Sequence, residues 1–240
     1  RAEMTMNAPL DGLIILDLTH VLAGPYASMT LADLGARVIK VERPGLGDDT
    51  RAFPPFKGSE SAYFATINHG KESIAFDLKN VDDRIVFNEL LSRSDVILEN
   101  YRPGVMERLG YGWEDLHTMY PQLIYGAVSG FGHSGPDSQR PAYDMVVQAR
   151  GGVMSITGER DREPVRVGAS IGDITAGMFL AQGILAALLH RQQTGVGQKV
   201  DIAMLDCQLA MLEHAIALTT MSDLSCHRNP TINHPLTPIR

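Results

Sequence analysis

Two side chains that could act as nucleophiles lie three residues apart in the stretch VGASIGDITAGM, from Val167 to Met178. Gly168 to Gly172 fits the pattern G-x-S-x-G, the elbow that presents the nucleophilic serine of many hydrolases, here Ser170. Asp173 begins a long apolar run, and a carboxylate there can either attack an activated carbonyl carbon or cap the helix. The residues alone leave both nucleophiles open.

The serine interpretation makes specific structural demands. Ser170 would have to lie on a sharp turn between a strand and a helix, with residues 165–167 as the strand. The other members of a triad would follow later in the chain, with Asp201 or Asp206 as the acid and His214 as the base.

The aspartate interpretation is compatible with a capping role. Asp173 is expected at the N-cap of a helix over residues 174–191, where the positive end of the helix would keep the carboxylate ionised. Gly172 and Gly177 are expected to open the space around it.

Apolar runs and helical patterns alternate along the chain, which predicts an α/β fold with a doubly wound, mostly parallel sheet. The predicted strands are residues 13–18, 37–42, 73–78, 95–100, 123–130 and 199–204. The predicted helices are residues 24–34, 81–92, 143–149, 174–191 and 205–220.

Polar residues follow several of these strands, at the edge where open α/β sheets bind ligands. Arg43 and Arg51 flank a glycine-rich loop, Asp77 and Lys79 end the third strand, and Asn100 to Arg102 with Arg108 follow the fourth. Each cluster by itself is equally typical of a solvated turn or an exposed helix face. Together they favour a site for an anion.

The composition and motifs argue against several kinds of partner and cofactor. A net charge of -7 argues against nucleic acid as a partner, and the apolar run over residues 174–189 is too short and interrupted for a membrane span. Cys207 and Cys226 lack the spacing of a zinc site and suit a reducing compartment, so we expect no metal. The first turn has one glycine where a dinucleotide fingerprint needs three, which argues against Glu42 as a ribose ligand.

The chain resembles the class III CoA-transferase family over about residues 9–221. The motifs that carry the resemblance are PLDGLIILDLTHVLAGPYASMTLADLGARVIKVERPGLGDDTR, ENYRPGVMERLGYGWEDL, GFGHSGPDSQRPAYD and GDITAGMFLAQGILAALLHRQQTGVGQKVDIAMLD. The resemblance implies a Rossmann-like large domain that binds coenzyme A and transfers it between carboxylic acids. It also implies that Asp173 is the nucleophile, forming a mixed anhydride and then an enzyme thioester, and that Ser170 is only a neighbour.

The same matching implies a set of coenzyme A contacts. They are His20, Val21, Leu22, Ala23, Arg43, Phe76, Asp77, Leu78, Lys79, Asn100, Tyr101, Arg102, Arg108, Arg140, Tyr143 and Asp144. The arginines among them are expected to converge on the phosphates, so that an acidic protein can hold a polyanion.

Related racemases share the fold and use a histidine within R-x-G-H-D to move an α-proton. The matching run here is Arg140 to Asp144, with Tyr143 in place of the histidine. An unperturbed tyrosine is a poor general base at neutral pH, which favours transfer over racemisation.

Family members are longer, near 400 residues, and add a smaller second domain that is absent from these 240 residues. We therefore expect residues 1–222 to form the coenzyme A-binding large domain and residues 223–240 to be an extended tail or truncated linker. The family implies an interlocked homodimer, so an inactive coenzyme A-binding fragment is an alternative to an active enzyme. The amino-terminal motif leans towards succinyl-CoA and dicarboxylic acids, with formyl-CoA and oxalate or carnitine-like acids as alternatives. We expect a cytoplasmic location, or the mitochondrial matrix if a transit peptide was removed.

Overall fold

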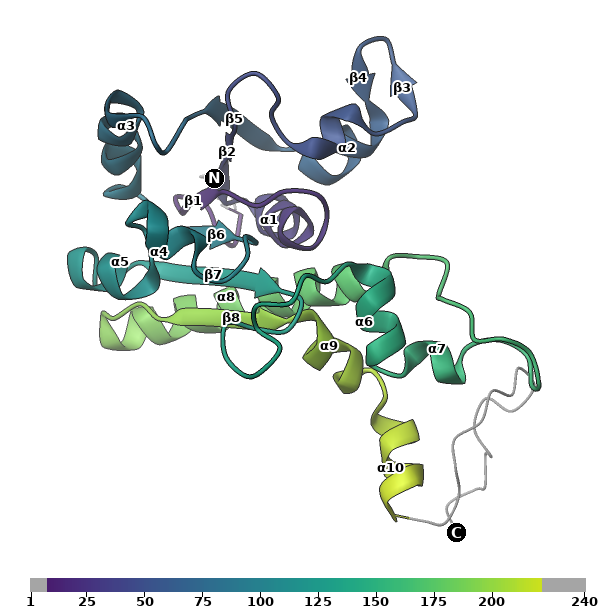
Figure 1. The fold of residues 1–240 in the computed structure, drawn as a ribbon. Coiled ribbons are helices and arrows are strands. Elements are labelled where there is room, and N and C mark those ends of the chain that lie inside the picture. The colour runs from purple at the N-terminus through teal and green to yellow at the C-terminus, as the bar shows by residue number, and fades with distance from the viewer. Residues whose placement is uncertain (1–7, 222–240) are drawn as a thin grey trace, which may run out of the picture.

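A six-stranded parallel sheet forms the centre of the computed structural model, which describes residues 8–221 (Figure 1). Its strands are β1 (Ile14–Asp17), β2 (Arg37–Glu42), β5 (Lys71–Ala75), β6 (Val96–Glu99), β7 (Ile124–Ser129) and β8 (Lys199–Ala203). All five strand pairings are parallel, so the predicted α/β class and parallel sheet are confirmed. The predicted tail at residues 223–240 lies outside the described residues.

The strand order β5-β2-β1-β6-β7-β8 reverses direction between β1 and β6. This is the order 3-2-1-4-5-6 of a Rossmann sheet once the small hairpin β3 (Phe56–Lys57) and β4 (Glu60–Ser61) is set aside. At such a switch point the loops that follow the two central strands diverge, which leaves a crevice at the carboxyl edge of the sheet.

Helices cover both faces of the sheet. They are α1 (Ala23–Asp33), α2 (Ala62–Asn68), α3 (Val81–Leu91), α4 (Val105–Leu109), α5 (Trp113–Met119), α6 (Asp144–Arg150), α7 (Val153–Ile156), α8 (Ile171–Thr194), α9 (Met204–Ala210) and α10 (Glu213–Met221), with a 3-10 turn at Asp49–Ala52. Buried residues of α1, α8 and α9 pack on one face, and those of α3, α4 and α5 pack on the other. Each strand of the sheet's centre is therefore apolar on both faces, which explains the continuous apolar runs.

Helix α8 is the longest helix and lies against α1 and β7 in the core. By length and composition alone, it is also long and apolar enough to cross a membrane. Its buried residues, which include Leu180, Ile184 and Leu188, belong to the same apolar cluster as Ile15 of β1. Packing in the core thus accounts for the apolar side chains of its buried face.

The structure differs from the predicted elements in three places. The predicted helix 205–220 is divided into α9 and α10, and α10 buries none of its residues against the described chain and projects beyond α9 (Figure 1). The third strand ends at Ala75, and Lys79 N donates to the Asp77 carboxylate in the turn that follows. The short helices α2, α4, α5 and α7 were not predicted, since four to seven residues are too few for a periodic pattern.

Candidate active site

Asp173 is the third residue of α8 and not its N-cap. Ser170 takes the N-cap position and makes no capping hydrogen bond through its side chain, so the predicted capping role of Asp173 is wrong. Residues 165–169 are irregular, and the strand that a serine elbow requires before Ser170 is therefore missing. This geometry favours Asp173 over Ser170 as the reactive side chain.

The first turn of α8 lies against the first turn of α6. Gly172 N donates to Asp144 Oδ1 at 2.7 Å, and Gln148 Nε2 donates to Asp144 Oδ2 at 2.7 Å. A Cβ added to Gly172 would come within 2.6 Å of Val147 Cγ2, so glycine is required for this close approach. Gly177 serves α1 in the same way, because its Cβ would meet Ala23 O at 2.6 Å. The two glycines therefore allow helices to pack closely, and the prediction that they open space around Asp173 is wrong.

The carboxylate of Asp173 accepts no hydrogen bond from residues 8–221. Burial, and secondly the negative charge of Asp144, raise the pKa of Asp173 to about 7. Burial and Asp144 therefore oppose the expected effect of the helix end, which favours the ionised carboxylate. A carboxylate that is accessible, unpaired and unusually basic is suited to nucleophilic attack.

Asp173 faces a cleft of about 420 Å³ at the carboxyl edge of the sheet, called the Asp173 cleft below. Its lining brings together the predicted residues His20, Val21, Leu22, Ala23, Asn100, Tyr143, Asp144 and Asp173. It also contains Val128, Ser129, Gly130, Ala142, Met145, Arg166, Ser170 and Met204. Burial lowers the pKa of His20, so its imidazole is neutral at pH 7.

Two further hollows continue along the same edge of the sheet. One of about 80 Å³ lies between His20, Arg43 and Tyr101. The next, of about 400 Å³, is lined by Arg43, Tyr101 and the predicted residues Phe76, Asp77, Leu78 and Lys79. Because neighbouring hollows share His20, or Arg43 and Tyr101, together with the Asp173 cleft they form a series along the strand ends.

Three predicted arginines do not line these hollows. Arg102 and Arg108 are exposed, and Arg140 forms an ion pair with Asp137 at 2.9 Å. Arg43 lines two hollows but is paired with Asp49. Of the four predicted arginines, only Arg43 lines one of these hollows, so the described residues do not show the expected convergence. Phosphate binding by the other three stays a prediction.

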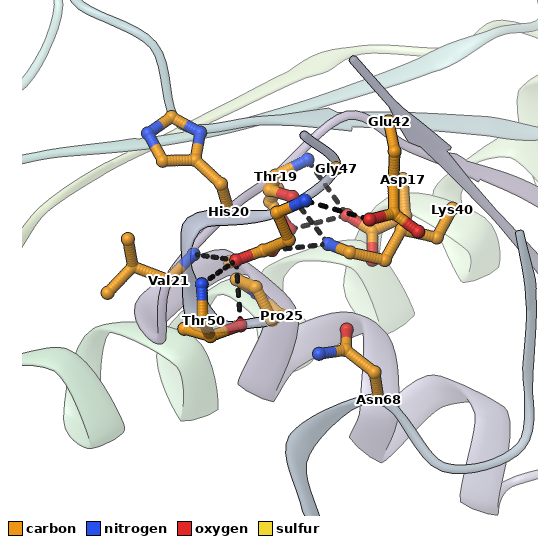
Figure 2. Close-up of polar contacts among 12 residues, drawn as sticks. Asp17, Thr19, His20, Val21, Pro25, Lys40, Glu42, Gly47, Thr50 and Asn68 are labelled. Carbon is orange, nitrogen blue, oxygen red and sulfur yellow. Dashed lines mark hydrogen bonds and ion pairs between the residues drawn. The ribbon is translucent and has the colours of Figure 1, made fainter. Parts of the chain in front are cut away.

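A buried ionic network lies beneath the loop that follows β1 (Figure 2). Lys40 Nζ is 2.9 Å from Asp48 Oδ2 and donates to Thr19 O at 2.7 Å, with both charged side chains almost fully buried. Val21 N donates to Asp48 Oδ1 at 3.3 Å, and Val21 has a φ of 65°, a conformation that β-branched residues rarely adopt. The Lys40–Asp48 pair therefore holds the loop that lines the Asp173 cleft in a strained conformation.

The carboxylate of Glu42, at the end of β2, already accepts hydrogen bonds from neighbouring residues. Burial alone would raise its pKa, but hydrogen bonds from Arg51 and Ser73 outweigh burial and lower the pKa to about 2. Its carboxylate also accepts from Asp48 N at 2.8 Å. A ribose hydroxyl would find these oxygens already bonded, in agreement with the missing dinucleotide fingerprint.

Arg166 is the charged residue of the cleft that sequence reasoning missed. It lies in the segment between α7 and α8 among other charged residues, which include Glu159, Arg160 and Arg162. Nothing in that pattern distinguishes the one arginine that reaches the cleft from those that face solvent. Within residues 8–221, no cluster of three or more His, Cys, Asp or Glu side chains is placed to hold a metal ion.

The chain thus has an α/β fold, and the Asp173 carboxylate faces a crevice at the strand switch point. Residues 10–239 match the model of CoA-transferase family III. The chain is 50% identical over 211 residues to the acetyl-CoA:oxalate CoA-transferase of Acetobacter aceti, covering 88% of this chain and 54% of that enzyme. It is 42% identical over 239 residues to the human succinyl-CoA:glutarate CoA-transferase, covering 99% of this chain and 55% of that enzyme.

The fold is also similar to that of a solved structure. A CaiB/BaiF family protein from Brucella suis superposes with a TM-score of 0.89 at 41% identity, covering 92% of this chain and 60% of that one. The chain therefore belongs to CoA-transferase family III, and the predicted resemblance is confirmed. It spans about half the length of the curated relatives it matches.

Proposed function

We propose that the protein to which this chain belongs transfers coenzyme A between two carboxylic acids, with Asp173 as the nucleophile. Asp173 Oδ attacks the thioester carbon of an acyl-CoA, the C–S bond breaks, and coenzyme A leaves as a thiolate from a mixed anhydride. The thiolate then attacks the Asp173 carbonyl carbon, which releases the donor acid as a carboxylate and leaves an enzyme thioester.

The second half of the reaction runs the same steps in reverse with the acceptor acid. Its carboxylate attacks the Asp173 thioester, giving a second anhydride and free thiolate. The thiolate attacks the acceptor's carbonyl carbon, and the Asp173 carboxylate is regenerated. Covalent catalysis of this kind divides one difficult exchange into easier steps.

The observation that carries the proposal is the state of the Asp173 carboxylate. It faces a 420 Å³ cleft, accepts no hydrogen bond from the described residues and has a pKa raised to about 7. A more basic carboxylate is a stronger nucleophile once ionised, and a pKa of about 7 leaves about half of it ionised at neutral pH. A carboxylate engaged by Arg or backbone N–H groups, such as Glu42, would be a poorer nucleophile.

We expect coenzyme A to bind along the three hollows. Its thioester end would lie in the Asp173 cleft, and the rest would cross His20 and Tyr101 towards Arg43 and Lys79. The names of the relatives, which act on oxalate and glutarate, support dicarboxylic acids as the partners of the exchange.

A trapping experiment tests the nucleophile. The full-length protein is incubated with succinyl-CoA and treated with hydroxylamine, which converts an acyl-linked carboxylate to a hydroxamate, and the modified peptide is mapped. We expect the hydroxamate on Asp173 and none in Asp173→Asn. Modification of Ser170 would support the hydrolase, and binding of coenzyme A by the folded protein without any exchange would support a binding module.

A further inference from the structure

The lining of the Asp173 cleft contains more acidic than basic side chains. Asp144 and Asp173 contribute carboxylates, and the pKa of His20 is lowered by burial, so that its imidazole is neutral at pH 7. Arg166 is the one arginine or lysine among the described residues that line the cleft. A substrate with an additional negative charge would be repelled by the two aspartates unless Arg166 offset them.

Arg166 is available to a ligand. Three other arginines are paired, Arg43 with Asp49, Arg51 with Glu42 and Arg150 with Asp137. Arg166 has neither an ion pair nor a hydrogen bond with residues 8–221, and its side chain is exposed where it lines the cleft. An unpaired guanidinium presents a planar set of donors that matches a carboxylate in two parallel hydrogen bonds.

The backbone next to Arg166 is fixed to the catalytic helices. Val167 N donates to Gln148 Oε1 at 2.8 Å, and the fully buried Gln148 also donates to Asp144. Asp144 in turn accepts from Gly172 N, the residue before Asp173. One chain of hydrogen bonds therefore connects the position of Arg166 to the position of the nucleophile.

We infer that Arg166 binds the carboxylate of the acid substrate that does not react, so that the cleft selects dicarboxylic acids. The inference rests on the proposed function. A dicarboxylic acid directs one carboxylate to Asp173 and pairs the other with Arg166. A monocarboxylic acid of similar length has no group for Arg166 to pair with and gains nothing from it.

Steady-state kinetics of the full-length protein test this assignment. Transfer from succinyl-CoA to glutarate is compared with transfer to butyrate in the wild type, Arg166→Gln and Arg166→Lys. In Arg166→Gln we expect the KM for glutarate to rise by about 10- to 100-fold with little change in kcat and in the KM for butyrate. Arg166→Lys should recover part of the loss, because lysine keeps the charge but not the fork of donors.

A matched control lies in the same loop. Arg162 is highly exposed, is 3.9 Å from Glu159 and does not line the cleft, so Arg162→Gln should leave both KM values unchanged. Equal changes for glutarate and butyrate in Arg166→Gln, or no change for either, would overturn the role of Arg166. Failure of the wild type to transfer coenzyme A to any acid would instead refute the proposed function.

Discussion

The side chain of Asn100 and the backbone of His20 form two reciprocal hydrogen bonds. His20 N donates to Asn100 Oδ1 at 2.9 Å, and Asn100 Nδ2 donates to His20 O at 2.7 Å. Asn100 follows β6 and His20 follows β1, the two strands between which the sheet order reverses. These bonds join the two loops at the point where the sheet order reverses, and both residues line the Asp173 cleft.

Removing this amide should loosen the loop after β1. Asn100→Ala loses both bonds, and we expect stability to fall by about 1–3 kcal/mol and the KM for acyl-CoA to rise by about tenfold. Asn100→Asp keeps an acceptor for His20 N but no donor for His20 O, so its KM should lie between those of the wild type and Asn100→Ala. Urea unfolding and steady-state kinetics measure the two effects, and an unchanged KM in Asn100→Ala would contradict this role.

The buried Lys40–Asp48 pair is expected to be a large determinant of stability. Lys40→Met leaves Asp48 buried without its cation, and it also removes a positive charge that helps to hold the pKa of the buried Asp17 below its usual range. We expect a loss of about 3–5 kcal/mol in the free energy of unfolding, measured with urea. Arg37→Met removes one partner of the exposed pair with Glu72 and should cost less than about 1 kcal/mol. Comparable losses in the two variants would argue against the importance of burial.

The contact between α6 and α8 should not tolerate a side chain at position 172. Gly172→Ala places a Cβ 2.6 Å from Val147 Cγ2 and 3.0 Å from Asp144 Oδ1, so the two helices must separate. We expect a loss of about 1–3 kcal/mol in stability together with lower activity, since Asp173 is the next residue. Gly168→Ala is the control, because its Cβ would meet nothing within 4 Å. Equal melting temperatures for both variants would be inconsistent with tight packing at Gly172.

The pH dependence of transfer should report the Asp173–Asp144 pair. Asp173 must be ionised to attack, so kcat/KM should rise with pH through about 7 on the acid limb. Asp144→Asn removes the negative charge that helps to raise this pKa but keeps an acceptor for Gly172 N, so the acid limb should move to lower pH by roughly half a pH unit or more.

The control for this shift is a remote carboxylate. Asp161 is exposed and has a φ of 62°, which asparagine also adopts readily, so Asp161→Asn should keep the wild-type profile. An acid limb that stays in place in Asp144→Asn would show that Asp144 does not act on Asp173.

The sheet could be predicted from the sequence because its strands are buried on both faces. Val38, Ile39 and Val41 supply the buried apolar side chains of residues 37–42, and β2 has the predicted bounds. The division of residues 205–220 into α9 and α10 could not be predicted, because apolar residues continue across the break at Met211 and Leu212. Local pattern therefore predicted the strands of the main sheet, while the break within residues 205–220 could not be read from it.

Site residues could be predicted from the sequence where they follow the end of a strand. Arg43 and Asn100 come directly after β2 and β6, His20 is in the loop after β1, and the structure gathers them along one edge. Arg166 lies in an irregular segment, where its position depends on a single backbone bond from Val167 to a buried glutamine. The raised pKa of Asp173 depends first on burial in the folded chain and secondly on Asp144, 29 positions earlier in the chain, and a local sequence pattern shows neither.

Oxygen transfer to Asp173 is the most direct test of the central claim. A single turnover of the full-length protein is run with an acceptor acid whose carboxylate carries heavy oxygen, and the Asp173 peptide is then weighed by mass spectrometry. The account predicts that one heavy oxygen passes from the acceptor to the Asp173 carboxylate, because the acceptor's bridging oxygen stays on Asp173 when thiolate attacks the second anhydride. Transfer of coenzyme A with no label on Asp173 would contradict it.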